Sequence, residues 1–102
     1  MNKREWARVY GSRERCRWIS EQPSVASGRG PCVNAHVTPN DDPPSGMGRK
    51  PDARWIVPLT YLEHLELHAS GTQTFQAYYG INLVGKAREI DRQWRLLNGE
   101  VE

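Results

Sequence analysis

The 102-residue chain has no long apolar run, and hydrophobic residues make up 37% of it. No segment approaches the roughly 18 apolar residues that a membrane-spanning helix needs. Two cysteines, Cys16 and Cys32, are too few for the disulfide framework of a small secreted domain. The N-terminal residues are polar and do not resemble a signal peptide. We therefore expect a cytoplasmic protein with two free thiols and no membrane association.

The chain also lacks a strong excess of one charge, since 14 Lys and Arg residues face 12 Asp and Glu residues, for a formal net charge of +2. Bulk charge therefore does not identify a nucleic-acid-binding protein. Basic residues nevertheless gather in two places: within residues 1–20, and at Arg49, Lys50 and Arg54. Either group could contact phosphates, and the alternative is that they lie on solvated helix faces.

Histidine is scarce as well, but two of the three histidines, His64 and His68, are four residues apart. On a helix this spacing puts both imidazoles on one face with Cβ atoms about 5–6 Å apart, close enough to hold one divalent cation. A zincin site is excluded because the first histidine is followed by Leu65 and not by glutamate. The alternative is an amphipathic helix that exposes two histidines and binds no metal.

The length indicates one domain, and nine glycines and seven prolines indicate long loops. Asn2 and Ser12 are typical N-caps of two short helices, and in the second helix Arg15, Cys16 and Ile19 are expected to face inward. Residues 32–38 and 54–59 read as strands. In the first strand His36 lies opposite the apolar face of Val33, Ala35 and Val37. Residues 39–53 form a long loop, a feature that is often functional in a small domain.

Thr60 and Glu63 form a capping box that begins the histidine helix, and Gly71 ends it. We expect Leu62, Leu65 and Ala69 to pack inward from this helix. Residues 72–79 predict a short helix with Phe75, Tyr78 and Tyr79 packing, and Asn82 caps a final one. The last helix carries an apolar stripe of Leu83, Ala87, Ile90, Trp94 and Leu97.

These residues supply the groups that hydrolysis of a phosphodiester needs: a base for water, a cation for the developing charge, and positive groups for the backbone. His36 is the candidate base, and a metal on His64 and His68 is the candidate cation. Arg49, Lys50 and Arg54 are the candidate backbone contacts. This interpretation requires the three imidazoles to converge. The alternative for His36 is a hydrogen-bonded structural histidine.

Four runs carry a family resemblance: Ala35-His36-Val37, residues 46–52 (GMGRKPD), Val57-Pro58-Leu59, and residues 64–68 (HLELH). Together they resemble the phage and prophage branch of the HNH endonuclease superfamily. In that branch a His-bearing strand, a glycine-rich loop and a Pro-Leu-x-x-x-x-His-x-x-x-His helix occur in this order. The resemblance covers about residues 16–80, and the last helix lies outside it.

The resemblance implies an α+β fold: a small ββα-metal core with a short two-stranded hairpin and a metal-bearing helix, flanked by additional helices. A single domain over 1–102 would hold that core at about 16–80 and a C-terminal helix at about 83–97. The implied activity is metal-dependent endonuclease cleavage of DNA, with His36 as general base. The implied ligands of Mg²⁺, Mn²⁺, Ni²⁺ or Zn²⁺ are His64 and His68, with Asp52 as an oxygen donor.

The chain also departs from the family pattern. Many relatives hold a structural zinc with two cysteine pairs, and here Ser24, Ser27, Thr60 and Glu63 stand at those positions. We therefore predict no structural zinc, and the capping box replaces it. Ala35 stands where many relatives keep an Asp or His ligand, and Trp55 stands near the middle Asn of the family. These departures leave two alternatives open: a catalytically weak or inactive nucleic-acid-binding or recombination accessory protein, and an interaction domain without a nucleic-acid role.

Overall fold

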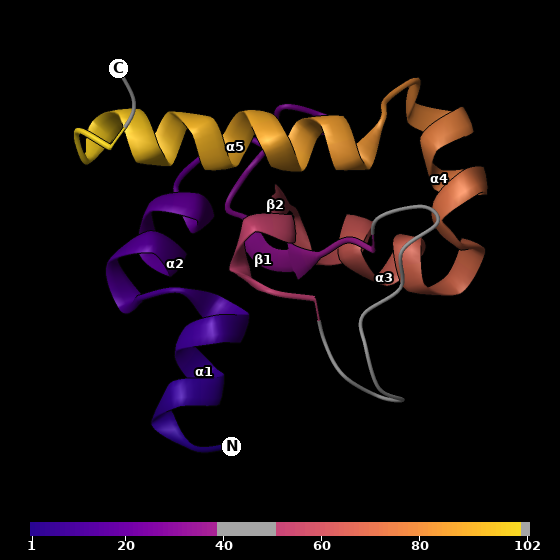
Figure 1. Cartoon of the computed structure of the whole chain (residues 1–102). Coiled ribbons are helices and arrows are strands. Elements are labelled where there is room, and N and C mark those ends of the chain that lie inside the picture. Colours follow the sequence, from indigo (N-terminus) through magenta and orange to yellow (C-terminus); the bar gives the residue numbers. More distant parts are fainter. Residues whose placement is uncertain (39–50, 101–102) are drawn as a thin grey trace.

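The fold is organised around a two-stranded antiparallel hairpin with helices on both sides (Figure 1). The computed structural model describes residues 1–38 and 51–100. In chain order the elements are α1 (Lys3–Tyr10), α2 (Arg13–Ser20), β1 (Val33–His36), the 3₁₀ turn η1 (Ala53–Trp55), β2 (Ile56–Leu59), α3 (Tyr61–Ser70), α4 (Thr72–Tyr79) and α5 (Leu83–Leu97). The predicted α+β class is confirmed. Both strands are shorter than predicted, and in the second strand η1 takes up the first predicted residues.

Side-chain caps set where the helices begin, as predicted. Asn2 accepts a hydrogen bond from the Glu5 N–H and begins α1, and Ser12 accepts from the Arg15 N–H and begins α2. Thr60 and Glu63 form the predicted capping box of α3. Each cap gives a partner to a backbone N–H that the first turn of a helix leaves unpaired.

The register of the hairpin gives it two different faces. Ala35 pairs with Val57, and His36 pairs with Ile56. Because successive strand residues point to opposite faces, each pair occupies one face. Ala35 and Val57 join a core with Leu67 of α3, whereas Ile56 packs with residues of α2 and α5. The predicted apolar face is therefore confirmed, and the His36 side of the hairpin faces α1 and α2.

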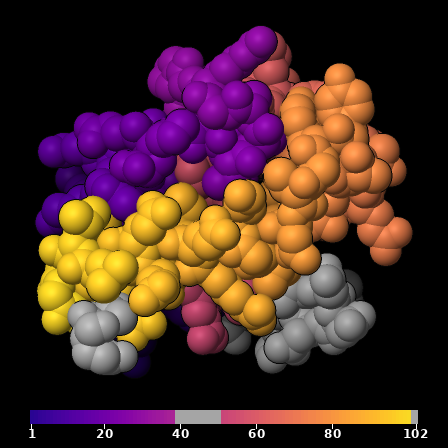
Figure 2. Space-filling view, turned by 90° about the horizontal axis from the view of Figure 1, so that it is seen from above, coloured from indigo at the N-terminus to yellow at the C-terminus, as the bar shows by residue number. Residues whose placement is uncertain are grey.

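Helix α5 belongs to the same core. It packs against β2 and η1, and Leu83 and Ala87 join the cluster of the α3 side while Ile90 joins the cluster of the α2 side. Figure 2 shows this helix in yellow and orange, alongside the indigo N-terminal helices. Although α5 is the longest helix, no helix in the described part of the chain is long and apolar enough to cross a membrane.

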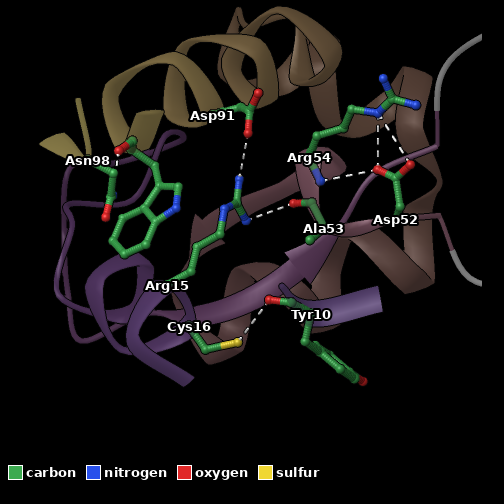
Figure 3. Close-up of polar contacts among 9 residues, drawn as sticks. Tyr10, Arg15, Cys16, Asp52, Ala53, Arg54, Asp91 and Asn98 are labelled. Carbon is green, nitrogen blue, oxygen red and sulfur yellow. Dashed lines mark hydrogen bonds and ion pairs between the residues drawn. The ribbon is translucent and has the colours of Figure 1, made fainter. Parts of the chain in front are cut away.

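A buried arginine links three segments on the α2 side. Arg15 is only 4% exposed, donates to the Ala53 carbonyl at 2.7 Å and pairs with Asp91 at 3.2 Å (Figure 3). Its guanidinium thus joins α2 to η1 and to α5. The predicted inward orientation of Arg15 is confirmed, and a partly buried charge pair of this kind is costly to break from one side.

The orientation of α3 differs from the prediction. Leu62 is 71% exposed and Leu65 47%, and Ala69 is exposed as well, so the predicted inward row is wrong. The residues that face the hairpin are Glu63 and Leu67. Tyr78, predicted to pack, is exposed on α4, and Leu97 is exposed at the end of α5. The hydrophobic pattern of α3 misleads because its inward row contains a buried carboxylate.

That carboxylate, Glu63, lies at the centre of a hydrogen-bonded cluster. It accepts from the Ser24 hydroxyl and from the Thr60 N–H, and the Ser24 oxygen in turn accepts from the N–H groups of Ala26 and Ser27. Burial by itself would raise the pKa of Glu63, but hydrogen bonds from Ser24, Ser27 and Thr60 outweigh it and hold the pKa below its usual range. The cluster joins the 24–27 loop to the start of α3.

A pH-dependent stability follows from the lowered pKa of Glu63. Ionised Glu63 stabilises the fold at neutral pH, and this contribution is lost as the pH falls below the ordinary glutamate value of 4.5 and through the lower folded value. Ser24→Ala should cost about 1–3 kcal/mol at pH 7, because a buried carboxylate loses a donor. Urea unfolding at several pH values measures both effects. Glu63→Gln should show a weaker dependence on acid, and an acid dependence identical to wild type would contradict the assignment.

Candidate functional site

Two imidazoles meet on α3. The Nε2 atoms of His64 and His68 lie 3.1 Å apart, and the ring centroids lie 4.7 Å apart. His64 is half-buried and His68 is exposed. The pair lies one residue beyond Glu63 and Leu67, and therefore about 100° around the helix from the row that packs on the hairpin. The predicted pairing on one helix face is confirmed.

This donor pair fits a divalent cation. Two imidazole nitrogens bound at 2.0–2.1 Å in tetrahedral geometry are about 3.3 Å apart, close to the observed separation of the Nε2 atoms. In neutral rings one N–H···N hydrogen bond accounts for the contact equally well. Within residues 1–38 and 51–100, no three His, Cys, Asp or Glu side chains come close enough to hold an ion together. The remaining ligands of a cation at this pair would come from water or substrate oxygens.

Asp52 is engaged elsewhere. Its carboxylate accepts from the Arg54 N–H at 3.2 Å, capping η1, and also pairs with the Arg54 guanidinium at 3.2 Å (Figure 3). The structure therefore does not bring Asp52 to the histidine pair, and its role as a ligand stays a prediction. Arg54 is exposed and extends over the Trp55 ring at 5.7 Å. The other two predicted DNA contacts, Arg49 and Lys50, lie outside the described residues.

His36 lies against α1. Its Nε2 atom is 2.7 Å from the Val9 carbonyl oxygen, and the Tyr10 ring meets it edge-on at 5.4 Å. A carbonyl oxygen can only accept, so this contact assigns the proton to Nε2. The lone pair of the neutral ring is then on Nδ1. A neutral histidine held in this tautomer keeps one basic nitrogen, which a general base needs.

The three histidines do not form one cluster among the described contacts. His36 lies on the hairpin face that α1 and α2 cover, whereas its neighbour Ala35 faces the α3 side and Leu67. Successive strand positions thus separate the candidate base from the face of the metal-binding helix. Contrary to the prediction from the sequence, the register therefore does not bring the three imidazoles together around one ion.

The two cysteines are not suited to act as nucleophiles. Both thiols are free, as predicted, with Cys32 buried and Cys16 half-buried. Burial raises the pKa of each thiol, so little reactive thiolate forms at neutral pH. Cys16 lies 3.4 Å from the Tyr10 carbonyl oxygen and Cys32 3.4 Å from that of Arg29. These contacts indicate structural thiols.

Some contacts of the site could not be read from the chain. The Val9 carbonyl that orients His36 is a backbone group with no sequence signature. The sequence gives a weak indication of the Tyr10 contact, because Tyr10 follows Trp6 by four residues and so shares its helix face. The Trp6 and Tyr10 rings do lie 5.5 Å apart.

Comparison with protein-family models, with curated proteins and with solved structures finds no match for this chain.

The histidine pair predicts measurable cation binding. Wild-type protein should bind about one equivalent of Zn²⁺ or Ni²⁺ in a calorimetric titration. His64→Ala and His68→Ala should each weaken binding at least tenfold. Removing a residue that only hydrogen-bonds to a metal ligand already lowers metal affinity about 10–100-fold, and here the ligand itself is removed. Leu65→Ala, a change at another exposed α3 residue, should leave the titration unchanged. Equal affinity in wild type and both histidine variants would contradict the site.

Proposed function

We propose that this protein is a metal-dependent endonuclease of the HNH type that hydrolyses DNA phosphodiester bonds. The observation that carries the proposal is the pair of Nε2 atoms 3.1 Å apart on the helix that directly follows the hairpin. The order of the elements supports it, because β1, β2 and α3 follow one another as a ββα unit would. The β1 strand also carries the candidate base, His36, at its end.

A second observation supports the family resemblance. The resemblance puts the positions of two zinc-binding cysteine pairs at Ser24, Ser27, Thr60 and Glu63, which are distant in sequence. In the structure these four residues form one hydrogen-bonded cluster around the Glu63 carboxylate. A chance resemblance would not require residues 24–27 to meet the start of α3. The cluster holds together the two segments that a zinc ion would hold.

In the proposed reaction each group has one task. Nδ1 of His36 accepts the proton of the attacking water, and the Val9 carbonyl stabilises the charged ring that results. His64 and His68 would hold a divalent cation, which would supply Lewis-acid stabilisation of phosphate charge. Arg54 is exposed, and in Figure 3 the outer nitrogens of its guanidinium point away from Asp52. Those nitrogens are available to a phosphate oxygen.

The position of His36 limits how a substrate can lie. Relatives keep a ligand at the position of Ala35, whose side chain here faces the α3 side, and the base is the next residue along β1. In the family pattern, therefore, a strand ligand and the base occupy adjacent positions whose side chains point to different faces of the hairpin. A DNA strand that crosses the end of β1 would be within reach of both faces of the hairpin.

One observation favours a second candidate, a nucleic-acid-binding or recombination accessory protein with weak or no cleavage. Ala35 cannot ligate a metal, and His36 makes the carbonyl and aromatic contacts of a structural histidine. Such a protein would keep the fold and the basic residues while having lost efficient chemistry. The two candidates differ in whether the protein cleaves the phosphodiester bond.

A plasmid-nicking assay separates these candidates. Supercoiled plasmid with Mg²⁺, Mn²⁺, Ni²⁺ or Zn²⁺ should be nicked by the wild-type protein, and EDTA should abolish nicking. His36→Gln retains an N–H for the Val9 carbonyl but has no basic nitrogen, so it should reduce the rate by roughly 10²-fold or more. His64→Ala should reduce it through loss of the cation. Gln93→Ala, at an exposed position of α5, serves as the matched control.

The outcomes are distinct. Nicking that depends on metal and on His36 supports the endonuclease. Equal inertness of wild type and His36→Gln across all four metals contradicts it. In that case, salt-dependent DNA binding by the wild-type protein would support the accessory role instead, because phosphate contacts release counterions whether or not a bond is cut.

A further inference from the structure

Three aromatic rings run in succession from the hairpin to the surface. The His36 ring contacts Tyr10 at 5.4 Å, and Tyr10 contacts Trp6 at 5.5 Å. Trp6 and Tyr10 lie on one face of α1 because they are four residues apart. The row therefore connects the candidate base with the outer part of α1.

At the outer end of this row the surface is hollowed. A cavity of about 380 Å³ is lined by Met1, Asn2, Lys3, Trp6 and Arg13. Its size lies in the lower part of the range of about 300–1,000 Å³ that is usual for small-molecule sites. Trp6 is half-buried, so one part of the ring packs on the protein while another part borders the cavity. The lining combines one large aromatic surface with polar and basic groups.

The charges at the cavity are of one sign. Lys3 and Arg13 are both exposed, and neither makes an ion pair with any residue of the described segments. Among residues 1–38 and 51–100, no carboxylate lines the cavity, and the neighbouring Glu5 is bound to Arg8 at 2.8 Å. An anionic group entering the cavity would therefore meet two cations. The lining thus suits a ligand with a flat aromatic part and a negative charge.

We propose that this cavity binds one unpaired nucleotide of single-stranded DNA, with its base stacked on Trp6 and its phosphate beside Lys3 and Arg13. Every base has a π-face, so a tryptophan platform accepts any of them, and cations alongside follow the backbone. A base inside a duplex is already stacked on its neighbours and cannot enter. The inference rests on the proposed function only for the idea that the strand continues along Tyr10 to His36.

The test is direct binding without cleavage. Fluorescence anisotropy in EDTA compares a labelled 12-nucleotide single strand with the same sequence as a duplex. Trp6→Leu should weaken single-strand binding by about tenfold, the loss typical of one base-stacking contact, and should change duplex binding little. Trp6→Phe should retain most of the affinity. Trp94→Leu is the matched control, because Trp94 packs on Trp18 instead of lining the cavity.

The two basic residues of the cavity are tested by the salt dependence of binding. Lys3→Gln and Arg13→Gln should each lower the slope of log affinity against log salt for the single strand by about 0.7. Arg17→Gln, also exposed on α2 but not lining the cavity, should leave that slope unchanged. Because these positions are exposed, we expect the variants to fold, and they carry the test if Trp6→Leu does not fold.

Three results with the tryptophan variants would overturn the proposal: single-strand affinity unchanged in Trp6→Leu, equal losses for single strand and duplex, or the same loss in Trp94→Leu. Unchanged salt slopes in Lys3→Gln and Arg13→Gln would also overturn it. Because no metal is present, the outcome does not depend on nicking. Loss of single-strand binding in Trp6→Leu together with a failed nicking assay would contradict the endonuclease and still support the nucleotide site.

Discussion

The buried carboxylate of Glu63 sets the orientation of the helix on which the candidate metal site depends. Its hydrogen bonds to Ser24 and to the Thr60 N–H hold the first turn of α3 against the 24–27 loop. With Glu63 and Leu67 facing the hairpin, His64 and His68 lie next to that contact on the open side of the helix. Rotating the helix to bury Leu62 and Leu65 would turn Glu63 toward solvent and break its hydrogen bond with Ser24.

The two faces of the hairpin carry different chemistry. On the α3 side lie the apolar core and, next to it, the imidazole pair suited to a cation. On the α1 side His36 is fixed in one tautomer and adjoins the aromatic row that ends at the basic cavity. A single polymeric substrate that passes around the end of β1 can use both faces, whereas a small molecule could occupy only one. The nucleic-acid substrate that we propose is of this extended kind.

Local features of the fold could be predicted from the sequence. The caps at Asn2, Ser12 and Thr60 depend on side chains within three residues of the N–H that they bind, and each forms as expected. The spacing of His64 and His68 depends only on helix geometry, so their pairing could be predicted as well. These interactions need no knowledge of the tertiary fold.

Features that join distant segments could not be predicted in the same way. The sequence predicts the wrong inward row for α3 because Leu62 and Leu65 have the spacing of a core stripe. The partner that allows Glu63 to be buried, Ser24, is 39 residues away. The environment of His36 depends on a backbone carbonyl 27 residues away. In both cases a polar group decides the packing, and hydrophobic periodicity carries no information about such partners.

We propose that His64 and His68 present two Nε2 lone pairs to one cation, while His36 keeps its proton on Nε2 for the Val9 carbonyl. Long-range proton–nitrogen NMR spectra of the three imidazoles, recorded during a Zn²⁺ titration, test this most directly. We expect the Nε2 signals of His64 and His68 to shift together and saturate near one equivalent, and the His36 signals to keep the Nε2–H pattern throughout. A Zn²⁺-dependent shift confined to one of the pair would rule out a shared cation, and a His36 ring protonated on Nδ1 would rule out the proposed tautomer.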